Sequence, residues 1–282
     1  MRCGIIDIGT NTIRSAIYEI GKDITEIGDK TTQSLILKYT ADGILSDEGI
    51  RLLIADILSA TEFFKSHGIT KTYCIATSAM RDVKNFDDVK NIIYQDSGTE
   101  IELLSEEKEA LCDFYALEEK GTGAGADIGG GSCQIIEFEK GNMIEYYSFK
   151  IGVKRLLYRF GQNGGNLSDY IRETIKPVKD FKSEVLYVMG GTAKGLRKAA
   201  KFCEVFKGGK IYFEDFETIA LQLENNEDVF SKLIGPRTKT LPYGMEVMRA
   251  LGEKFGAEAV EVINSGVREG YLIGKFFKNC KE

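Results

Sequence analysis

One short stretch of the sequence combines an acid, bare backbone and a hydroxyl. In GADIGGGSCQIIEF (125–138), Asp127 lies near the end of an apolar run, and an alternating strand pattern follows. Between these two patterns the chain reads Gly129, Gly130, Gly131 and Ser132. Glycines leave backbone N–H groups accessible because no Cβ shields them, and several such donors can converge on one anion. The pattern indicates a turn that binds phosphate oxygens, with the Ser132 hydroxyl as a further donor.

The same pattern occurs near the start of the chain. DIGTNT (7–12) aligns with DIGGGS (127–132) at a shift of 120 residues, and both follow D-I-G-x-x-[S/T]. The candidate phosphate-binding residues of this first turn are Asp7, Gly9, Thr10 and Asn11. A repeat with so long a period predicts two similar domains rather than a solenoid.

A third glycine turn, GGTAKG (190–195), follows an apolar strand pattern and opens a helical one. Because a helix N-terminus favours negative charge, Gly191 and Thr192 are further candidates for phosphate contacts. The sequence contains neither a dinucleotide-binding G-x-G-x-x-G at the start of a helix nor a G-x-x-x-x-G-K-[S/T] loop. One glycine hairpin alone is usually only a tight turn, so it is the combination of the three that favours phosphate binding.

The hydrophobic pattern supplies the elements that would position these turns. Strands are expected at 3–8, 12–20, 24–38, 71–79, 100–104, 124–128, 133–138, 184–189 and 259–264, and helices at 46–67, 86–98, 105–121, 190–202 and 265–277. Ser46 is the expected N-cap of the first helix. The sequence therefore predicts an α/β fold with two domains, residues 1–119 and 120–282. Whether the last helix packs back on the first domain stays open.

Composition restricts the possible functions. The 282 residues carry a net charge of −6, which argues against a general nucleic-acid binder, and no apolar run is long enough to span a bilayer. The N-terminus does not resemble a signal peptide. Six cysteines without a C-x-x-C pair favour reduced thiols in a cytoplasmic protein. The single histidine, His67, precedes a glycine helix stop, which argues against a histidine-based zinc site or a Ser-His-Asp triad.

Residues 150–210 form a basic stretch, with 14 Lys and Arg against 5 Asp and Glu. Two interpretations stay open, a solvated helical face and a path for a polyanion. The residues that would line such a path are Lys154, Arg155, Lys194, Arg197 and Lys198. Lys and Arg serve equally there because a flexible polyanion needs charge more than fixed geometry.

Seven segments, taken in order, resemble one known family. They are DIGTNTIR (7–14), ATSAMRD (76–82), SEEKEAL (105–111), DIGGGS (127–132), IGVKRL (151–156), GGTAKGL (190–196) and SGVREG (265–270). Together they resemble the exopolyphosphatase / guanosine pentaphosphate phosphohydrolase family of the actin–sugar kinase–Hsp70 superfamily, without the helical C-terminal region of longer members. The resemblance covers nearly the whole chain. It implies two ribonuclease-H-like domains with mixed sheets flanked by helices, and an active site in the cleft between the domains.

The resemblance also implies a catalytic base, at Glu109 in EKEAL. A carboxylate within hydrogen-bond reach of water can take its proton as the water attacks phosphorus. Glu106 and Asp113 lie on the same predicted helix face, and such like charges would raise the proton affinity of Glu109. From the residues alone, a solvated acidic helix face is the simpler interpretation.

Two arginines match the family in the same way. Arg81 matches an arginine that approaches the phosphate, and Arg268 would lie near a helix start beside the cleft. The alternatives are a surface arginine for Arg81 and, for Arg268, an ion pair with Glu269 or another neighbour.

One position departs from the family pattern. The family's DIGGGS aspartate helps to hold Mg²⁺, together with a glutamate two positions after the serine. Asp127 matches the aspartate, whereas Gln134 stands where the family has the glutamate. A glutamine carbonyl can ligate Mg²⁺ but supplies no net charge, so the metal affinity should fall. Three outcomes stay open: an enzyme with weaker or different metal dependence, an enzyme whose substrate brings its own Mg²⁺, and a binding protein without turnover.

The sequence therefore predicts a phosphohydrolase that releases terminal orthophosphate from inorganic polyphosphate or guanosine pentaphosphate. The alternative is a catalytically weak or inactive sensor of nucleotides or polyphosphate. A sugar or acetate kinase is disfavoured because SEEKEAL supplies a base for water and no obvious acceptor pocket. The expected partner is the phosphate substrate, with neither a nucleic-acid duplex nor a membrane, and homodimerisation stays open.

Overall fold

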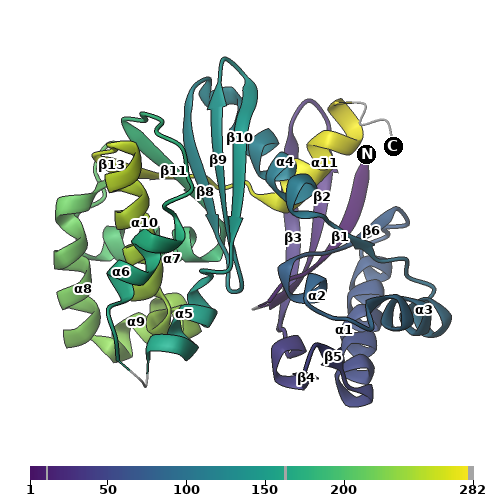
Figure 1. The fold of residues 1–282 in the computed structure, drawn as a ribbon. Helices are drawn as coiled ribbons and strands as arrows, with labels where there is room; N and C mark the ends of the chain where they lie inside the picture. The colour runs from purple at the N-terminus through teal and green to yellow at the C-terminus, as the bar shows by residue number, and fades with distance from the viewer. Residues whose placement is uncertain (11, 162–163, 279–282) are drawn as a thin grey trace. The chain divides into compact units, whose positions relative to one another are not determined.

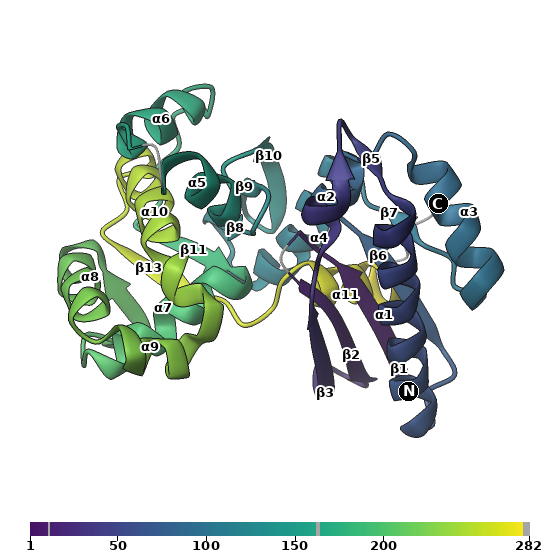
Figure 2. The same cartoon turned by 90° about the horizontal axis from the view of Figure 1, so that it is seen from below.

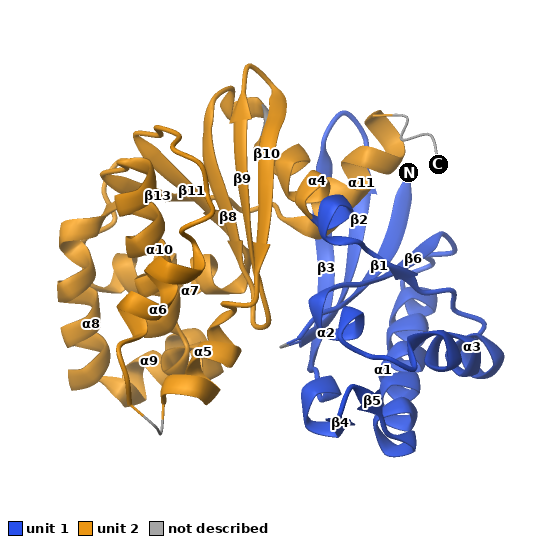
Figure 3. Ribbon diagram, in the orientation of Figure 1, with its two compact units in different colours: residues 1–109 blue, residues 110–282 orange. Residues whose placement is uncertain are grey.

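The structure is a computed structural model that describes residues 1–10, 12–161 and 164–278. The chain divides into two compact units, residues 1–109 and 110–282 (Figure 3). Each unit contains its own sheet and its own hydrophobic core. The domain boundary between residues 119 and 120 stays a prediction. Asn11, one of the predicted phosphate-binding residues, lies outside the described residues.

Unit 1 is built on a mixed five-stranded sheet with the strand order β3-β2-β1-β6-β7. The strands are β1 (Arg2–Ile8), β2 (Thr12–Ile20), β3 (Ile24–Gln33), β6 (Thr72–Ala76) and β7 (Glu102–Leu103). Antiparallel pairing joins β1, β2 and β3, whereas β6 runs parallel to β1 and β7 parallel to β6. The remaining elements are η1 (Ile36–Tyr39), β4 (Thr40–Ala41), β5 (Ile44–Leu45), α1 (Asp47–Ser66), α2 (Ser78–Arg81) and α3 (Phe86–Ser97).

One face of this sheet is covered by α1 and α3 (Figures 1 and 2). Their apolar side chains pack with the alternate residues of β1, among them Ile6 and Ile8. At the predicted start of α1, the Gly49 N–H donates to Ser46 Oγ at 3.3 Å, which confirms the N-cap. Such a cap satisfies one of the N–H groups that have no partner inside the helix.

Unit 2 is built on a mixed six-stranded sheet with the order β10-β9-β8-β11-β13-β12. The strands are β8 (Gly123–Ile128), β9 (Cys133–Glu139), β10 (Asn142–Phe149), β11 (Val185–Met189), β12 (Lys210–Tyr212) and β13 (Ala259–Val262). The helices are α5 (Val153–Phe160), α6 (Leu167–Thr174), α7 (Gly190–Phe202), η3 (Phe213–Asp215), α8 (Phe216–Asn225), α9 (Glu227–Ile234), η4 (Gly235–Lys239), α10 (Leu241–Phe255) and α11 (Val267–Phe277). Helix α4 (Glu106–Leu117) and the short η2 (Glu118–Lys120) precede β8.

Helices pack on both faces of this second sheet. One face packs with α5, α6, α7 and α10 (Figures 1 and 2). The other face packs with α4, whose Ala110, Phe114 and Leu117 contact a cluster that includes Ile136 and Phe138 of β9. Across the described residues, none of the helices combines the length and the apolar character that crossing a bilayer requires.

The predicted internal repeat is present in the sheet topology. In each unit an antiparallel three-stranded meander is followed by a strand parallel to its first strand, β6 in unit 1 and β11 in unit 2. The two glycine turns occupy the same place, between the first and second strands. The register pairs Asp7 with Arg14 and Asp127 with Gln134, so the acids have equivalent partners across the two hairpins. This arrangement confirms the predicted α/β fold with two mixed sheets flanked by helices.

Two predicted strands are shorter than expected. The strand predicted at 24–38 ends at Gln33, and a 3₁₀ turn over Ile36–Tyr39 follows it. The strand predicted at 71–79 ends at Ala76, because Ser78–Arg81 form the short helix α2 instead. In both places the apolar pattern continues beyond the strand because the following turn is also buried, as Ile36 and Met80 are.

Candidate functional site

The glycine turn of unit 2 is fixed from behind by the start of α5. The carbonyl of Gly129 accepts from the Val153 N–H at 3.0 Å, and the carbonyl of Gly130 accepts from the Lys154 N–H at 3.0 Å. The carbonyl of Gly131 accepts from Nε of Arg155 at 2.8 Å. Within the described part of the chain, no group accepts a hydrogen bond from the N–H groups of Gly130 and Gly131. The turn therefore has its acceptors engaged on α5 and backbone donors available for an anion.

Gly152 is what lets α5 approach the turn so closely. A Cβ at this position would lie 2.4 Å from backbone atoms of Gly131 and 2.5 Å from the carbonyl carbon of Gly130. No side chain fits there unless the turn moves. The segment IGVKRL (151–156) thus supplies Gly152, which leaves room for the turn. It also supplies the three following residues, whose N–H groups donate to the carbonyls of the turn.

Gln134 lies on the strand that leaves this turn, and only 1% of it is exposed. Its Nε2 donates to Oγ of Ser132 at 2.9 Å. The register places Gln134 directly across the hairpin from Asp127. The buried amide is therefore hydrogen-bonded to the turn and lies opposite its acid in the hairpin.

Asp127 lies against the third glycine turn. A Cβ on Gly190 would be 2.3 Å from Oδ1 of Asp127, and Gly190 has a φ of +87°. Glycine is required there both by the left-handed backbone and by the carboxylate beside it. Burial, and then the Asp127 and Asp113 carboxylates, raise the pKa of the Cys133 thiol, which keeps this thiol neutral.

Helix α7 begins at Gly190, and no side chain caps its N-terminus. Thr192 is buried, and its methyl group lies 2.3 Å from the place where a Cβ on Gly244 of α10 would be. Gly191 is exposed and lies beside Arg237, whose Nε is 3.1 Å from the position of a Gly191 Cβ. The two predicted residues thus differ in exposure, Gly191 being exposed and Thr192 buried, and their contact with phosphate stays a prediction.

The sequence-based prediction missed Arg237. Its side chain runs along α7 over two glycines one turn apart, because Cβ atoms on Gly191 and Gly195 would both contact it. This places a guanidinium at the start of α7. The glycine spacing on α7 is the signal that could have indicated a close neighbour, but nothing in GPRTKT (235–240) identifies which residue it is.

The glycine turn of unit 1 has the same local design. The Gly9 N–H donates to the Thr12 carbonyl at 3.1 Å, as the Gly129 N–H donates to the Ser132 carbonyl at 3.0 Å. Asp7 lies at the end of β1, and Thr10 is buried. The carbonyl of Ile8 accepts from the Thr77 N–H at 3.3 Å, so this turn lies beside the segment that leads into α2.

Arg81 and Glu109 form a buried ion pair in unit 1. Nη1 of Arg81 lies 2.5 Å from Oε2 of Glu109 and also donates to the Leu104 carbonyl at 2.9 Å. The side chains are 17% and 7% exposed. Glu109 is therefore not on a solvated acidic face, because its neighbours Glu106 and Glu107 are exposed whereas it is buried. An adjacent guanidinium stabilises the charged carboxylate, which is the form that can accept a proton.

The predicted basic path is divided between two helices. Lys154 and Arg155 lie at the start of α5 against the turn, and burial lowers the pKa of Lys154. Lys194, Arg197 and Lys198 lie on α7. Arg197 donates to Oδ1 of Asn264 at 2.5 Å, and Lys198 is exposed.

Arg268 lies in the first turn of α11. The neighbouring Glu269 is buried, and its carboxylate accepts from the Gly266 N–H at 2.8 Å, closing the N-terminus of the helix. Helix α11 also packs tightly on α4, because a Cβ on Gly270 would overlap the Cys112 carbonyl. Arg268 is thus held at a helix start, as predicted, although its role stays a prediction.

Asp127 and Gln134 are a poor match for a resident Mg²⁺ site. Among the described residues, no group of three or more His, Cys, Asp or Glu side chains is arranged to hold a metal ion. Gln134 directs its amide nitrogen at Ser132, which leaves Asp127 as the charged ligand of the pair. Mg²⁺ is usually held by one or two carboxylates together with substrate phosphates, so Asp127 suits an ion that arrives with its substrate.

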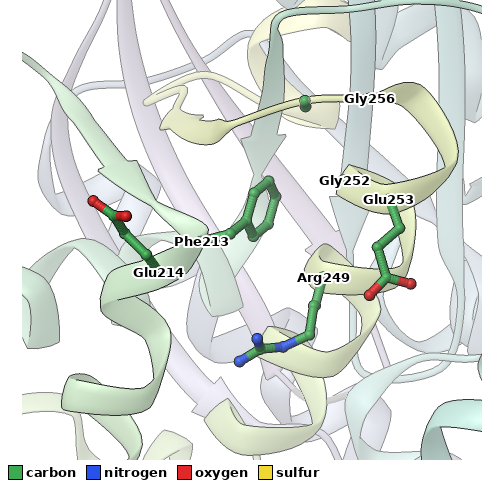
Figure 4. A pocket seen from close by; sticks show the side chains of 7 residues that line it. Phe213, Glu214, Arg249, Gly252, Glu253 and Gly256 are labelled. Atoms are coloured by element: carbon green, nitrogen blue, oxygen red, sulfur yellow. The ribbon is translucent and has the colours of Figure 1, made fainter.

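A cavity of about 430 Å³ lies elsewhere in unit 2, near the C-terminal end of α10 (Figure 4). Phe213, Arg249, Gly252 and Glu253 are among the residues that line it. Both carboxylate oxygens of Glu253 accept from Arg172, at 3.0 and 3.1 Å. None of the predicted site residues that the structure describes lines this cavity, so the turns are the stronger candidate site.

Comparison with known proteins gives consistent matches. A model of the Ppx/GppA phosphatase family matches residues 22–279. Exopolyphosphatase 1 of Mycobacterium tuberculosis is 30% identical over 143 residues, covering 48% of this chain and 42% of the relative. A bifunctional 3-dehydroquinate synthase/phosphatase of Fusobacterium nucleatum is 26% identical over 294 residues, covering 91% and 44%. The chain thus spans less than half the length of these two curated relatives.

Solved structures share the fold over the whole chain. The Aquifex aeolicus member of the Ppx/GppA family has a TM-score of 0.83 at 20% identity, with 100% of this chain and 99% of that chain covered. An exopolyphosphatase from Cytophaga hutchinsonii has a TM-score of 0.84 at 20% identity, with 98% and 97% covered. The family match extends over most of the sequence and includes the turns of unit 2, the base candidate and the α11 arginine. The chain belongs to the Ppx/GppA phosphatase family.

Proposed function

We propose that the protein is a phosphohydrolase that releases terminal orthophosphate from inorganic polyphosphate or guanosine pentaphosphate. The observation that carries the proposal is the buried pair of Arg81 and Glu109, because it holds a carboxylate in the form that accepts a proton. The names of the mycobacterial exopolyphosphatases favour polyphosphate as the substrate. In this proposal the glycine turn of each unit supplies backbone donors to phosphate oxygens of the substrate.

Glu109 acts as the general base. Its carboxylate takes a proton from water while the water oxygen forms a bond to the terminal phosphorus. The bond between that phosphorus and the bridging oxygen breaks, and its electron pair stays with the bridging oxygen on the shortened substrate. The products are orthophosphate and a substrate shorter by one phosphate. The reaction depends mainly on positioning and on stabilisation of phosphate charge, and the turns supply donors for both purposes.

Arg81 orients Glu109 through its Nη1 and directs its remaining N–H groups to a phosphate oxygen. Lys154 beside the unit 2 turn, with the basic residues of α7, attracts the rest of the polyanion. Mg²⁺ would be held by Asp127 and by the substrate phosphates, and when bound it neutralises part of the phosphate charge.

Phosphate release from long-chain polyphosphate tests the base directly. Glu109→Gln removes the proton acceptor but keeps the side-chain shape, so the rate should fall by about 10²- to 10⁴-fold. Glu106→Gln is the matched control, because Glu106 is exposed in the first turn of the same helix and should leave the rate unchanged. If Glu109→Gln keeps full activity with an unchanged melting temperature, Glu109 is not the base.

Gln134 favours a second candidate function, a sensor that binds polyphosphate or a guanosine nucleotide without turnover. The neutral amide removes a carboxylate that the family resemblance assigns to Mg²⁺. A sensor would show a rise in melting temperature with polyphosphate or guanosine pentaphosphate and no release of orthophosphate, with or without Mg²⁺. An enzyme would release orthophosphate under at least one of these conditions.

A further inference from the structure

The side chain of Gln134 determines which way the Ser132 hydroxyl can donate. A serine hydroxyl has one proton and two lone pairs, whereas an amide nitrogen can only donate. The Gln134 Nε2–H points at Ser132 Oγ at 2.9 Å and occupies one of those lone pairs. The Ser132 proton must therefore point away from Gln134. Both residues are buried, at 1% and 5% exposure, so bulk water does not compete for this arrangement.

We propose that Gln134 is a positioning residue that turns the Ser132 hydroxyl proton toward the bound phosphate, and that the unit 2 turn thereby binds phosphate without a resident metal ion. This inference rests on the proposed phosphate-binding role of the turn. A hydrogen bond from a hydroxyl to an anionic oxygen is among the stronger kinds. Together with the N–H groups of Gly130 and Gly131, Ser132 presents donors only.

A glutamate at this position would have the opposite effect. An ionised carboxylate accepts hydrogen bonds and cannot donate them. It would take the Ser132 proton for itself, and the hydroxyl would present a lone pair to the phosphate. The carboxylate would also add a negative charge beside the turn, which a cation would have to offset. With glutamate at this position the turn would need a cation to bind phosphate, whereas with glutamine the turn presents hydrogen-bond donors to it.

The repeat supports this interpretation from within the same chain. The register partner of Asp7 in unit 1 is Arg14, which occupies the place of Gln134 and is also a donor. Arg14 donates to Glu26 at 2.5 Å and to Asp29 at 3.2 Å. In both hairpins the residue opposite the acid in the register is thus a side chain that can donate, and not a second carboxylate.

A double-mutant cycle on tripolyphosphate binding tests the role of Gln134. Calorimetry in EDTA would compare wild type, Gln134→Met, Ser132→Ala and the double variant, because Met keeps the length of Gln without its donor. We expect Gln134→Met and Ser132→Ala each to weaken binding about three- to tenfold. The double variant should bind no more weakly than Ser132→Ala alone. If the two effects multiply, or if Gln134→Met binds as wild type does, the inference is wrong.

Gln134→Glu is the second variant, and it keeps the shape of the side chain in case Met disturbs folding. It should lose at least tenfold in tripolyphosphate affinity in EDTA and regain most of it in MgCl₂. The tripolyphosphate affinity of wild type should change less between EDTA and MgCl₂ than that of Gln134→Glu. If wild type and Gln134→Glu lose the same factor in tripolyphosphate affinity on going from MgCl₂ to EDTA, the inference is wrong.

The outcomes also separate this inference from the proposed function. Tripolyphosphate binding that follows the predicted cycle, without any phosphate release, would refute the hydrolase and leave the role of Gln134 intact. An absence of tripolyphosphate binding by wild type in both buffers would refute both.

Discussion

Replacing Gly152 by alanine should move the unit 2 turn without changing any of the residues in the turn itself. The variant therefore tests whether the position of the turn matters for activity. The added Cβ would lie 2.4 Å from backbone atoms of Gly131, whereas ordinary contact begins at 3.4 Å. The turn or the start of α5 has to move by the difference, about 1 Å. The atoms that the Cβ would contact belong to the backbone of Gly130 and Gly131, so they cannot rotate away as the end of a flexible side chain could.

The variant should affect both catalysis and stability. A misplacement of about 1 Å at a binding group can lower a rate about 10²-fold, because reacting groups lose their alignment. Overpacking at a buried site typically costs about 1–3 kcal/mol in free energy of unfolding. We therefore expect Gly152→Ala to lower kcat/KM for polyphosphate about 10²-fold while the protein stays folded in buffer.

The assay is orthophosphate release from polyphosphate, with thermal unfolding followed in parallel. Gly21→Ala is the matched control, because a Cβ at Gly21 would meet nothing within 4 Å. That variant should keep both activity and melting temperature. Wild-type kcat/KM in Gly152→Ala, with an unchanged melting temperature, would refute the idea that the α5 start fixes the catalytic position of the turn.

Two further predictions concern charged groups. Arg81→Met removes the guanidinium beside the buried Glu109 carboxylate and should lower the free energy of unfolding, measured by urea titration, by about 3 kcal/mol. Arg81→Lys should keep part of the stability. If Arg81→Met is as stable as wild type, the ion pair does not stabilise the fold. Burial lowers the pKa of Lys154 below the usual 10.5, so its positive charge is lost at a lower pH than that of an exposed lysine. Tripolyphosphate affinity should therefore fall at alkaline pH below 10.5, and Lys154→Met should lack this phase; an identical pH profile in both proteins would exclude Lys154 from the site.

Local features of the fold could be predicted from the sequence because they depend on neighbouring residues. The two glycine hairpins, the Ser46 cap and the strand leading into Gly190 each follow from a few adjacent positions. The repeated D-I-G-x-x-[S/T] pattern also predicted that the chain contains two similar domains. Residues 203–258 gave no comparable pattern, and the structure fills them with β12, α8, α9 and α10.

The parts of the site that could not be predicted depend on contacts between distant residues. Arg81 and Glu109 were both singled out, but their ion pair joins residues 28 positions apart and is not visible in either segment. The place of Arg237 over α7 likewise depends on how η4 packs. Like-charge neighbours were expected to dominate around Glu109, whereas the structure places a guanidinium at 2.5 Å from it.

The carbonyl and N–H groups of the peptides in the unit 2 turn have different partners. The carbonyls of Gly129 and Gly130 accept from the first N–H groups of α5, while the N–H groups of the same peptides, those of Gly130 and Gly131, are the donors proposed for phosphate. A phosphate that draws on these N–H groups polarises the same amides and strengthens the bonds on their carbonyl side. Occupancy of the turn is thereby transmitted through single peptide planes to the end of a helix, and the bound and empty protein should differ in how firmly that helix is anchored.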